Sequence, residues 1–266
     1  MHKVLIIVNA KVKDAGKIIS ASPVTEKMVS AICEAVNQEV LRHKISNISG
    51  EPLAVKVPKP VKIEVISAGT LWSEQEKPKG NNTSIYCPLT IQLPDRFDFP
   101  ARNIYKACQD IKGRRRWVEK NLGYKVCTSD RQLGDLWLPV VVTEKGSLYG
   151  EVIGEGEIPN SYQQPVDLPD KQRQYLYKLA YNLLESIEAL PSVYLVQFSW
   201  RAGEIIFDRL WPFPAAPALA SIGVQQPDLY KCHWYCLTKQ PILDLTIATS
   251  LTQVNTSKQD IIRAKR

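Results

Sequence analysis

The stretch that decides the fold runs from Ser192 to Ile242 and reads SVYLVQFSWRAGEIIFDRLWPFPAAPALASIGVQQPDLYKCHWYCLTKQPI. Two runs of alternating apolar residues, Val193–Phe198 and Glu204–Leu210, flank the turn Arg201-Ala202-Gly203, and this pattern predicts a β-hairpin. A proline-punctuated loop, Trp211-Pro212-Phe213-Pro214, comes next. Two short helical segments follow that loop. The stretch therefore predicts a hairpin, a loop and two helices in succession.

The composition is that of an ordinary globular protein: 266 residues, of which 44% are apolar and 23% charged. This length predicts one large domain or two modest ones. No apolar run approaches the roughly 18 residues that cross a bilayer, so we expect no membrane partner. The short apolar run Val4–Val8 predicts a first strand, not a signal peptide. The six cysteines have no framework spacing, and we expect reduced thiols in a cytoplasmic protein.

The formal net charge of +7 permits nucleic acid as a partner without requiring it. The densest basic cluster is Arg114, Arg115 and Arg116, followed directly by Trp117, whose ring is suited to stacking on a base. Three consecutive helical positions spread over roughly 200°, so these arginines do not form one pad. A solvated helix face with Trp117 in the core is the alternative interpretation, and both remain open.

Periodicity and punctuation predict the elements of the first hundred residues. We expect strands at Lys3–Val8, Val61–Ser67 and Ile85–Leu93, the last at a sheet edge because Pro88 has no amide hydrogen. Ser22 and Pro23 open a helix, which we expect to end near the cations Arg42–Lys44. A polar, lysine-rich loop is expected at Ser73–Ser84.

Asp95–Pro100 reads as a linker, and we place a domain boundary at residue 100. Ala101–Leu122 has a helical pattern that we expect to divide near Lys112–Arg116, and Leu138–Thr143 with Ser147–Ile153 predicts a hairpin. A polar loop through Asn160 and Pro165 follows. The apolar series from Leu176 to Leu190 then predicts a helix that Asp167 or Asp170 caps. The predicted organisation is an amino-terminal α/β domain (1–100), a second domain (101–245) and a polar basic tail (246–266).

Motifs for catalysis and metal binding are sparse. The chain has no GxSxG, no phosphate-binding glycine motif, and no histidine beside a candidate serine. Cys232, His233 and Cys236 are the densest metal-ligating group, but a zinc site needs three or four converging ligands and the chain has no second pair. We therefore interpret these cysteines as buried small hydrophobes and predict no metal there.

The opening stretch resembles the carboxy-terminal part of the N5-carboxyaminoimidazole ribonucleotide synthase family, which has the ATP-grasp fold. That family has Gly-Glu-Val-Leu-Val-Asn-Glu-Ile-Ala-Pro-Arg-Pro-His after its last turn, and Gly203–Ala215 lies on this motif without a gap. Further matches are Ile222, Tyr230, His233, Pro241-Ile242 and, more weakly, Gln109-Asp110 with Trp117–Lys120. The resemblance covers roughly Ile104–Leu245. It implies an α/β (α+β) fold with a reduced ATP-grasp-like domain after a smaller α/β domain.

The departures from that family fall on its chemistry. The resemblance implies Mg²⁺ held between two acidic side chains and an asparagine and bridging the phosphates of ATP. The matching residues here are Gln197, Asp208 and Arg209; glutamine is a weaker ligand, and arginine brings positive charge to a cation position. Pro-Arg-Pro-His becomes Pro212-Phe213-Pro214-Ala215, without either polar group. The family's glycine-rich lid and most central strands have no expected counterpart, since Leu138–Ile153 reads as a single hairpin.

Three functions stay open on the sequence alone. The favoured hypothesis is a non-catalytic ATP-grasp-like protein without a cofactor, which acts through protein or nucleic-acid contacts. The second is a divergent but active ATP-dependent carboxylate-amine ligase, with Asp208, Glu204 and Asp228 as remade Mg²⁺ ligands. The third is a basic RNA- or DNA-binding protein that uses Lys112–Trp117 and its carboxy-terminal tail.

Overall fold

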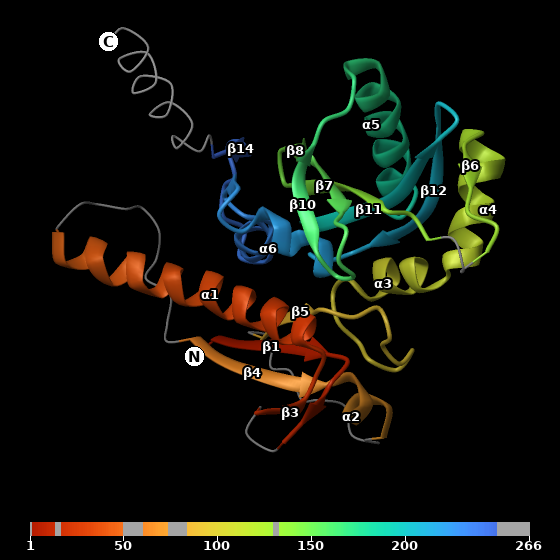
Figure 1. Ribbon diagram of the computed structural model, residues 1–266. Coiled ribbons are helices and arrows are strands. Elements are labelled where there is room, and N and C mark those ends of the chain that lie inside the picture. Colours follow the sequence, from red (N-terminus) through yellow and green to blue (C-terminus); the bar gives the residue numbers. More distant parts are fainter. Residues whose placement is uncertain (1, 14–16, 50–60, 74–83, 130–132, 249–266) are drawn as a thin grey trace, which may run out of the picture.

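The computed structural model describes residues 2–13, 17–49, 61–73, 84–129 and 133–248. Most of the loop predicted at Ser73–Ser84 and most of the predicted tail lie outside these ranges. Two sheets organise the described chain, a three-stranded one from the amino-terminal region and a seven-stranded one after residue 124 (Figure 1). The α/β fold class predicted from the sequence is confirmed.

The small sheet is parallel and has β1 (His2–Val8) at its centre, between β4 (Val61–Ser67) and β5 (Ser84–Pro88). Val4–Val8 are fully or almost fully buried, as expected for a strand covered on both faces. β5 is an edge strand, as Pro88 predicted, but it ends at that proline and does not continue to Leu93. Three short elements adjoin this sheet: β2 (Lys11–Val12), β3 (Ile18–Ser20) and α2 (Ala68–Ser73).

Helix α1 (Pro23–Ser49) begins where the sequence predicted, because Ser22 Oγ accepts a hydrogen bond from the Thr25 amide at 3.2 Å. It continues past the predicted end near Lys44. Cations stabilise a helix terminus without ending the helix, and the first glycine or proline after Pro23 is Gly50. Helix α1 packs against α6 (Leu229–Leu237), which lies between α1 and the large sheet in Figure 1.

The predicted hairpin is confirmed and lies within the seven-stranded sheet as β11 (Ser192–Arg201) and β12 (Glu204–Trp211). The strand order is β10-β9-β7-β11-β12-β6, with β8 also paired to β7. The other strands are β6 (Lys125–Val126), β7 (Leu136–Thr143), β8 (Gly146–Tyr149), β9 (Val152–Glu155) and β10 (Tyr162–Val166). Both β8 and β9 pair with β7, so the hairpin predicted at Leu138–Thr143 with Ser147–Ile153 is present, with its second strand interrupted at Gly150 and Glu151. The strands that the sequence did not predict are β10 and β6, and both lie at edges of the sheet.

Three local predictions are wrong. The predicted polar loop contains β10, where Pro165 is tolerated because β10 is an edge strand. Helix α5 (Asp170–Glu185) follows Pro169 and has no side-chain cap, so neither Asp167 nor Asp170 caps it. The helical pattern after residue 101 divides at Asp110, not within the basic run, into α3 (Arg102–Gln109) and α4 (Ile111–Leu122). The Asp110 carboxylate accepts from the Gly113 amide at 2.9 Å and so starts α4.

The two faces of the large sheet belong to two hydrophobic cores. Alternate residues of β11 separate them: Val193 and Leu195 join one core, while Tyr194 and Val196 join the other. Helices α4 and α5 cover the second core. The first also contains β1, α1, α6 and the 3₁₀ helix η1 (Ala216–Ser221). It therefore joins the two sheets, and the boundary at residue 100 stays a prediction.

Beyond α6 the chain forms β14 (Thr246–Ile247), which pairs with β13 (Gln225–Gln226), so the first residues of the predicted tail belong to a strand pair. Among the helices of the described ranges, none combines the length and the apolar character that crossing a bilayer requires.

Candidate functional site

A β-bulge in β12 places Asp208. Gln197 faces Arg209 across the hairpin and Phe198 faces Phe207, so Asp208 is an extra residue on its strand. The bulge shifts the alternation of β12, and as a result both Phe207 and its neighbour Asp208 are completely buried. A buried carboxylate needs partners of opposite charge or several hydrogen bonds.

Both carboxylate oxygens of Asp208 have partners. Arg115 Nη2, from α4, lies 2.5 Å from Oδ1, and Arg209 Nε donates to the same oxygen at 3.1 Å. The Gly134 amide donates to Oδ2 at 2.9 Å, and Arg115 Nε donates to the backbone carbonyl of Asp208 at 3.1 Å. One carboxylate is thus held by two guanidinium groups, through charge-assisted hydrogen bonds.

Gln197 is bonded at both ends of its amide. Its Nε2 donates to the Gly134 carbonyl at 2.6 Å, and its Oε1 accepts from Trp211 Nε1 at 2.9 Å. The Arg209 guanidinium lies 5.8 Å from the centre of the Trp211 ring, a cation–π distance. We name this network the Asp208 cluster; its members are Arg115, Gly134, Gln197, Asp208, Arg209 and Trp211.

The donor set of the Asp208 cluster does not fit Mg²⁺. Magnesium binds oxygen ligands, usually carboxylates and phosphates, in a strict octahedral arrangement. Here one carboxylate is already paired with two arginines, and the Gln197 oxygen is taken by Trp211. A divalent cation would meet the charges of both guanidinium groups at close range.

The structure does not bring the alternative ligands Glu204 and Asp228 to Asp208. Glu204 starts β12 and pairs with Lys125; it lies four residues from Asp208 along the strand, about 13 Å at roughly 3.3 Å per residue. Asp228 caps α6, and its Oδ1 accepts from the amides of Tyr230 and Lys231, at 3.0 Å each. Across the described ranges, no group of three or more His, Cys, Asp or Glu residues could hold a metal ion.

The basic run of α4 is not one surface. Arg115 is 6% exposed and serves Asp208, while the Arg114 guanidinium lies 5.4 Å from the centre of the Trp117 ring and donates to Ser186 Oγ at 3.2 Å. Arg116 is exposed. Helical spacing could have identified Arg115 as internal, because it falls three or four residues from Ile111 and Val118. A nucleic-acid contact through Arg116 and Trp117 stays a prediction.

Cys232, His233 and Cys236 all lie buried in α6. The two thiols face backbone carbonyls at 3.4 Å, those of Pro227 and Val142, and burial raises the pKa of each. All six cysteines of the chain are free thiols. The cysteines of α6 are therefore packing residues with their sulfur protons retained.

Comparisons with known proteins identify the fold. No protein-family model and no curated protein sequence matches this chain. Among solved structures, N5-carboxyaminoimidazole synthetase from Staphylococcus aureus, crystallised with ADP, superimposes with a TM-score of 0.63 at 9% identity, over 92% of this chain and 80% of that one. Phosphoribosylaminoimidazole carboxylase ATPase subunit from Aquifex aeolicus superimposes with a TM-score of 0.56 at 8% identity, over 99% of this chain and 87% of that one.

Glycinamide-RNase-transformylase T from Mycobacterium tuberculosis gives a TM-score of 0.59 at 11% identity, over 93% and 82% of the two chains. Matches over more than nine-tenths of the chain include most of residues 1–100, so the likeness extends beyond Ile104–Leu245. The resemblance seen in the sequence is thus confirmed at the level of structure: the chain has the fold of ATP-grasp proteins.

Proposed function

We propose that this ATP-grasp-fold protein is non-catalytic, does not use Mg·ATP, and acts through contacts with a macromolecular partner. The observation that carries the proposal is the pairing of the buried Asp208 carboxylate with Arg115 and Arg209. Asp208 and Arg209 are two of the residues that match the magnesium ligands of the resembled family in sequence. An arginine at one matched position and a second arginine from α4 therefore hold the carboxylate that a metal would need as a ligand.

The energetics support this proposal. Removing one partner of a buried ion pair costs about 3–5 kcal/mol, and a metal would have to displace both arginines from Asp208 before it gained a carboxylate ligand. The ligase alternative loses support because Glu204 and Asp228 have partners of their own and lie apart from Asp208.

Exposed tyrosines favour a protein as the partner. Tyr181 is 54% exposed on α5, and one turn before it Tyr177 stacks on Tyr149 with ring centres 4.4 Å apart. Tyrosine combines large contact area with a polar tip and is enriched in protein interfaces.

Nucleic acid is the alternative partner, and replacing Arg116 tests it. Unchanged oligonucleotide affinity and salt dependence in Arg116→Ala would remove that residue from any phosphate contact.

A thermal-shift titration with Mg·ATP tests the central claim. A ligand at 100 times its Kd stabilises by about 2.7 kcal/mol, which raises Tm by roughly 5–10 °C for a chain of this size. We expect no saturable shift up to millimolar Mg·ATP. The Staphylococcus aureus synthetase, whose structure contains ADP, is the positive control. Saturable stabilisation of this chain by Mg·ATP would refute the proposal.

A further inference from the structure

A cavity of about 370 Å³ lies between the small sheet and the large one. One wall comes from β5 and from residues 99–105, and the other from the start of β11 and from α6. It shares no lining residue with the Asp208 cluster. Its lining is rich in aromatic rings, namely Tyr86, Phe99, Tyr105 and Tyr194. The volume is at the lower end of the roughly 300–1,000 Å³ of small-molecule sites, which often lie between two parts of a fold.

His233 lines this cavity and is 2% exposed. Its Nδ1 lies 3.2 Å from Ser192 Oγ and accepts from the Val193 amide at 3.5 Å. An amide nitrogen is only a donor, so Nδ1 is the acceptor and the ring proton is on Nε2. Burial lowers the pKa of His233 to about 3, so the ring is neutral near pH 7.

The Nε2–H of His233 is a buried donor with no acceptor among the described residues. Buried polar groups nearly always have a hydrogen-bond partner, so an unpartnered donor requires an explanation. Two hydroxyl donors of the same lining are already used: Tyr105 donates to the Pro88 carbonyl and Tyr194 to the Leu190 carbonyl, each at 2.8 Å. Tyr86 also brings a hydroxyl to this lining, but among the buried donors there His233 Nε2–H is the one without a partner. The Nε2 atom has almost no accessible surface, so a ligand reaches it only when neighbouring side chains move aside.

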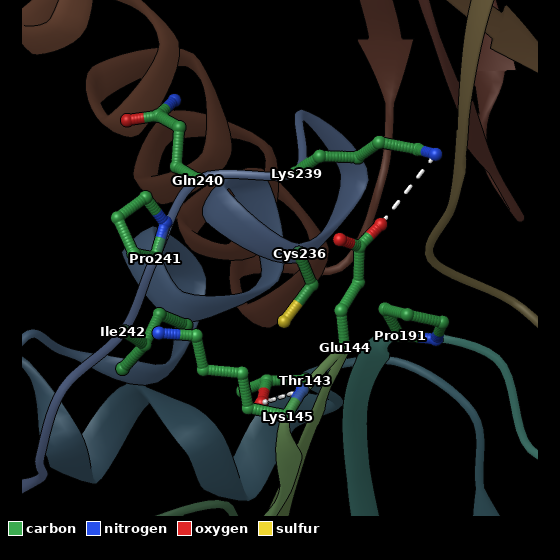
Figure 2. A pocket seen from close by; sticks show the side chains of 9 residues that line it. All are labelled: Thr143, Glu144, Lys145, Pro191, Cys236, Lys239, Gln240, Pro241 and Ile242. Atoms are coloured by element: carbon green, nitrogen blue, oxygen red, sulfur yellow. Dashed lines mark hydrogen bonds and ion pairs between the residues drawn. The ribbon is translucent and has the colours of Figure 1, made fainter.

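Charges lie only at the rim of this lining. Glu144 and Lys239 form an ion pair at 3.5 Å, and their side chains are 60% and 78% exposed. The same two residues, with Pro191 and Cys236, also line a neighbouring cavity of about 170 Å³ (Figure 2). The lining has neutral donors and no charge away from its rim, which favours an uncharged ligand, because a charged ligand would lose its hydration without a counter-ion.

We propose that the larger cavity binds a small, uncharged molecule with a flat apolar body and a carbonyl-type oxygen that accepts the hydrogen bond of His233 Nε2–H. This site is independent of the proposed function, because it involves none of the Asp208 cluster.

Acetophenone and α-methylstyrene form a matched pair of probes, since they differ in a carbonyl oxygen against a methylene group. Nitrogen-15 NMR of the three histidines would follow binding to the full chain. We expect acetophenone to shift the Nε2 resonance of His233 saturably and to bind about tenfold more tightly than α-methylstyrene, a factor within the range for one hydrogen bond to a buried donor. Equal affinities, or an unshifted His233 resonance at saturation, would overturn the proposal.

Two variants locate the site. His233→Phe keeps a ring and removes the donor, so the preference for acetophenone should disappear while weak binding remains. Ile85→Trp, on the edge strand β5, adds a ring to the cavity wall and should abolish binding of both probes. If His233→Phe does not fold, the Nε2 resonance of His233 in the wild-type chain and the binding measured with Ile85→Trp still test the proposal. Binding that survives Ile85→Trp unchanged would place the probes elsewhere and refute this site.

Discussion

The guanidinium of Arg115 lies 2.5 Å from the carboxylate of Asp208, although 93 residues separate them in the chain. Both side chains are buried, with 7% and 0% of their surface exposed. The pair joins α4 to the bulge of β12, and Gly134 and Gln197 extend the network to β11. A position that resembles a magnesium ligand is thus part of the packing between a helix and the central hairpin.

Replacing Arg115 should destabilise the fold. Arg115→Met leaves the buried Asp208 carboxylate with Arg209 and Gly134 as its remaining partners, and we expect a loss of about 3 kcal/mol, the lower end for a broken buried pair. Urea unfolding of Arg115→Met, of Asp208→Asn and of the double variant gives the coupling energy. Arg116→Met, at the exposed neighbour, is the matched control and should change stability by less than about 0.5 kcal/mol. Similar losses in both arginine variants would contradict the internal role of Arg115.

Gly134 should not tolerate a side chain. A Cβ there would lie 2.6 Å from the carbonyl oxygen of Phe198, a backbone atom that cannot move without disturbing β11. We expect Gly134→Ala to destabilise by about 1–3 kcal/mol, the usual cost of overpacking. Gly69→Ala is the control, because its Cβ would meet only Ser67 Oγ, at 3.2 Å. Chemical denaturation of both variants checks the difference; an unaffected Gly134→Ala would mean that the 133–134 segment is looser than described.

The hairpin turn leaves room for stabilisation. Ala202 has a φ of 50°, a left-handed conformation that costs an alanine roughly 1 kcal/mol, and it precedes Gly203 at 80°. Two left-handed residues in a two-residue turn favour Asn-Gly. Ala202→Asn should therefore raise stability by about 0.5–1 kcal/mol, and Ala202→Val should lower it, since a β-branched residue resists positive φ. A higher melting temperature for Ala202→Val than for Ala202→Asn would exclude this turn geometry.

His233 predicts a pH dependence of stability. Burial lowers its pKa from 6.5 to about 3, so between these values the unfolded chain binds a proton that the folded chain does not. Stability therefore falls as pH falls below 6.5, by up to about 1.4 kcal/mol per unit and about 2–3 kcal/mol by pH 4.5. Urea unfolding from pH 7.5 to 4.5 measures the slope. The slope should be shallower in His233→Phe, while parallel curves would show that His233 titrates normally.

Patterns of local sequence predicted most of the elements, because hairpins and amphipathic helices have short-range signatures. The structure contains the helix predicted from Ser22-Pro23 and the hairpin predicted from Arg201-Ala202-Gly203. The polar strand β10 had no such signature, because an edge strand does not need alternating apolar residues.

The Asp208 cluster was predicted only in part. Gln197, Asp208 and Arg209 could be identified because they lie on one continuous motif of the resembled family. Arg115 was misread as part of a basic run. Its partner is 93 residues away, and only the tertiary packing of α4 on β12 brings the two together. Tertiary packing decides which cation pairs with a buried carboxylate. Helical periodicity shows only that Arg115 lies on an apolar face of its helix.

Restoring carboxylates to the hairpin should create a response to magnesium that the wild-type chain lacks. In Gln197→Glu with Arg209→Glu, two carboxylates join Asp208 and one guanidinium is lost, so the local charge changes from +1 to −2 with Arg115 still present. Without metal we expect the variant to be less stable than wild type, because the new carboxylates repel Asp208. Added Mg²⁺ should recover stability in a saturable manner. Thermal unfolding with 0 and 10 mM Mg²⁺ measures this recovery. The control is the single variant Arg209→Gln, which loses the guanidinium but adds no carboxylate. If wild type and the control respond to Mg²⁺ as the carboxylate variant does, the arginines do not exclude the metal, and a non-catalytic role loses its structural basis.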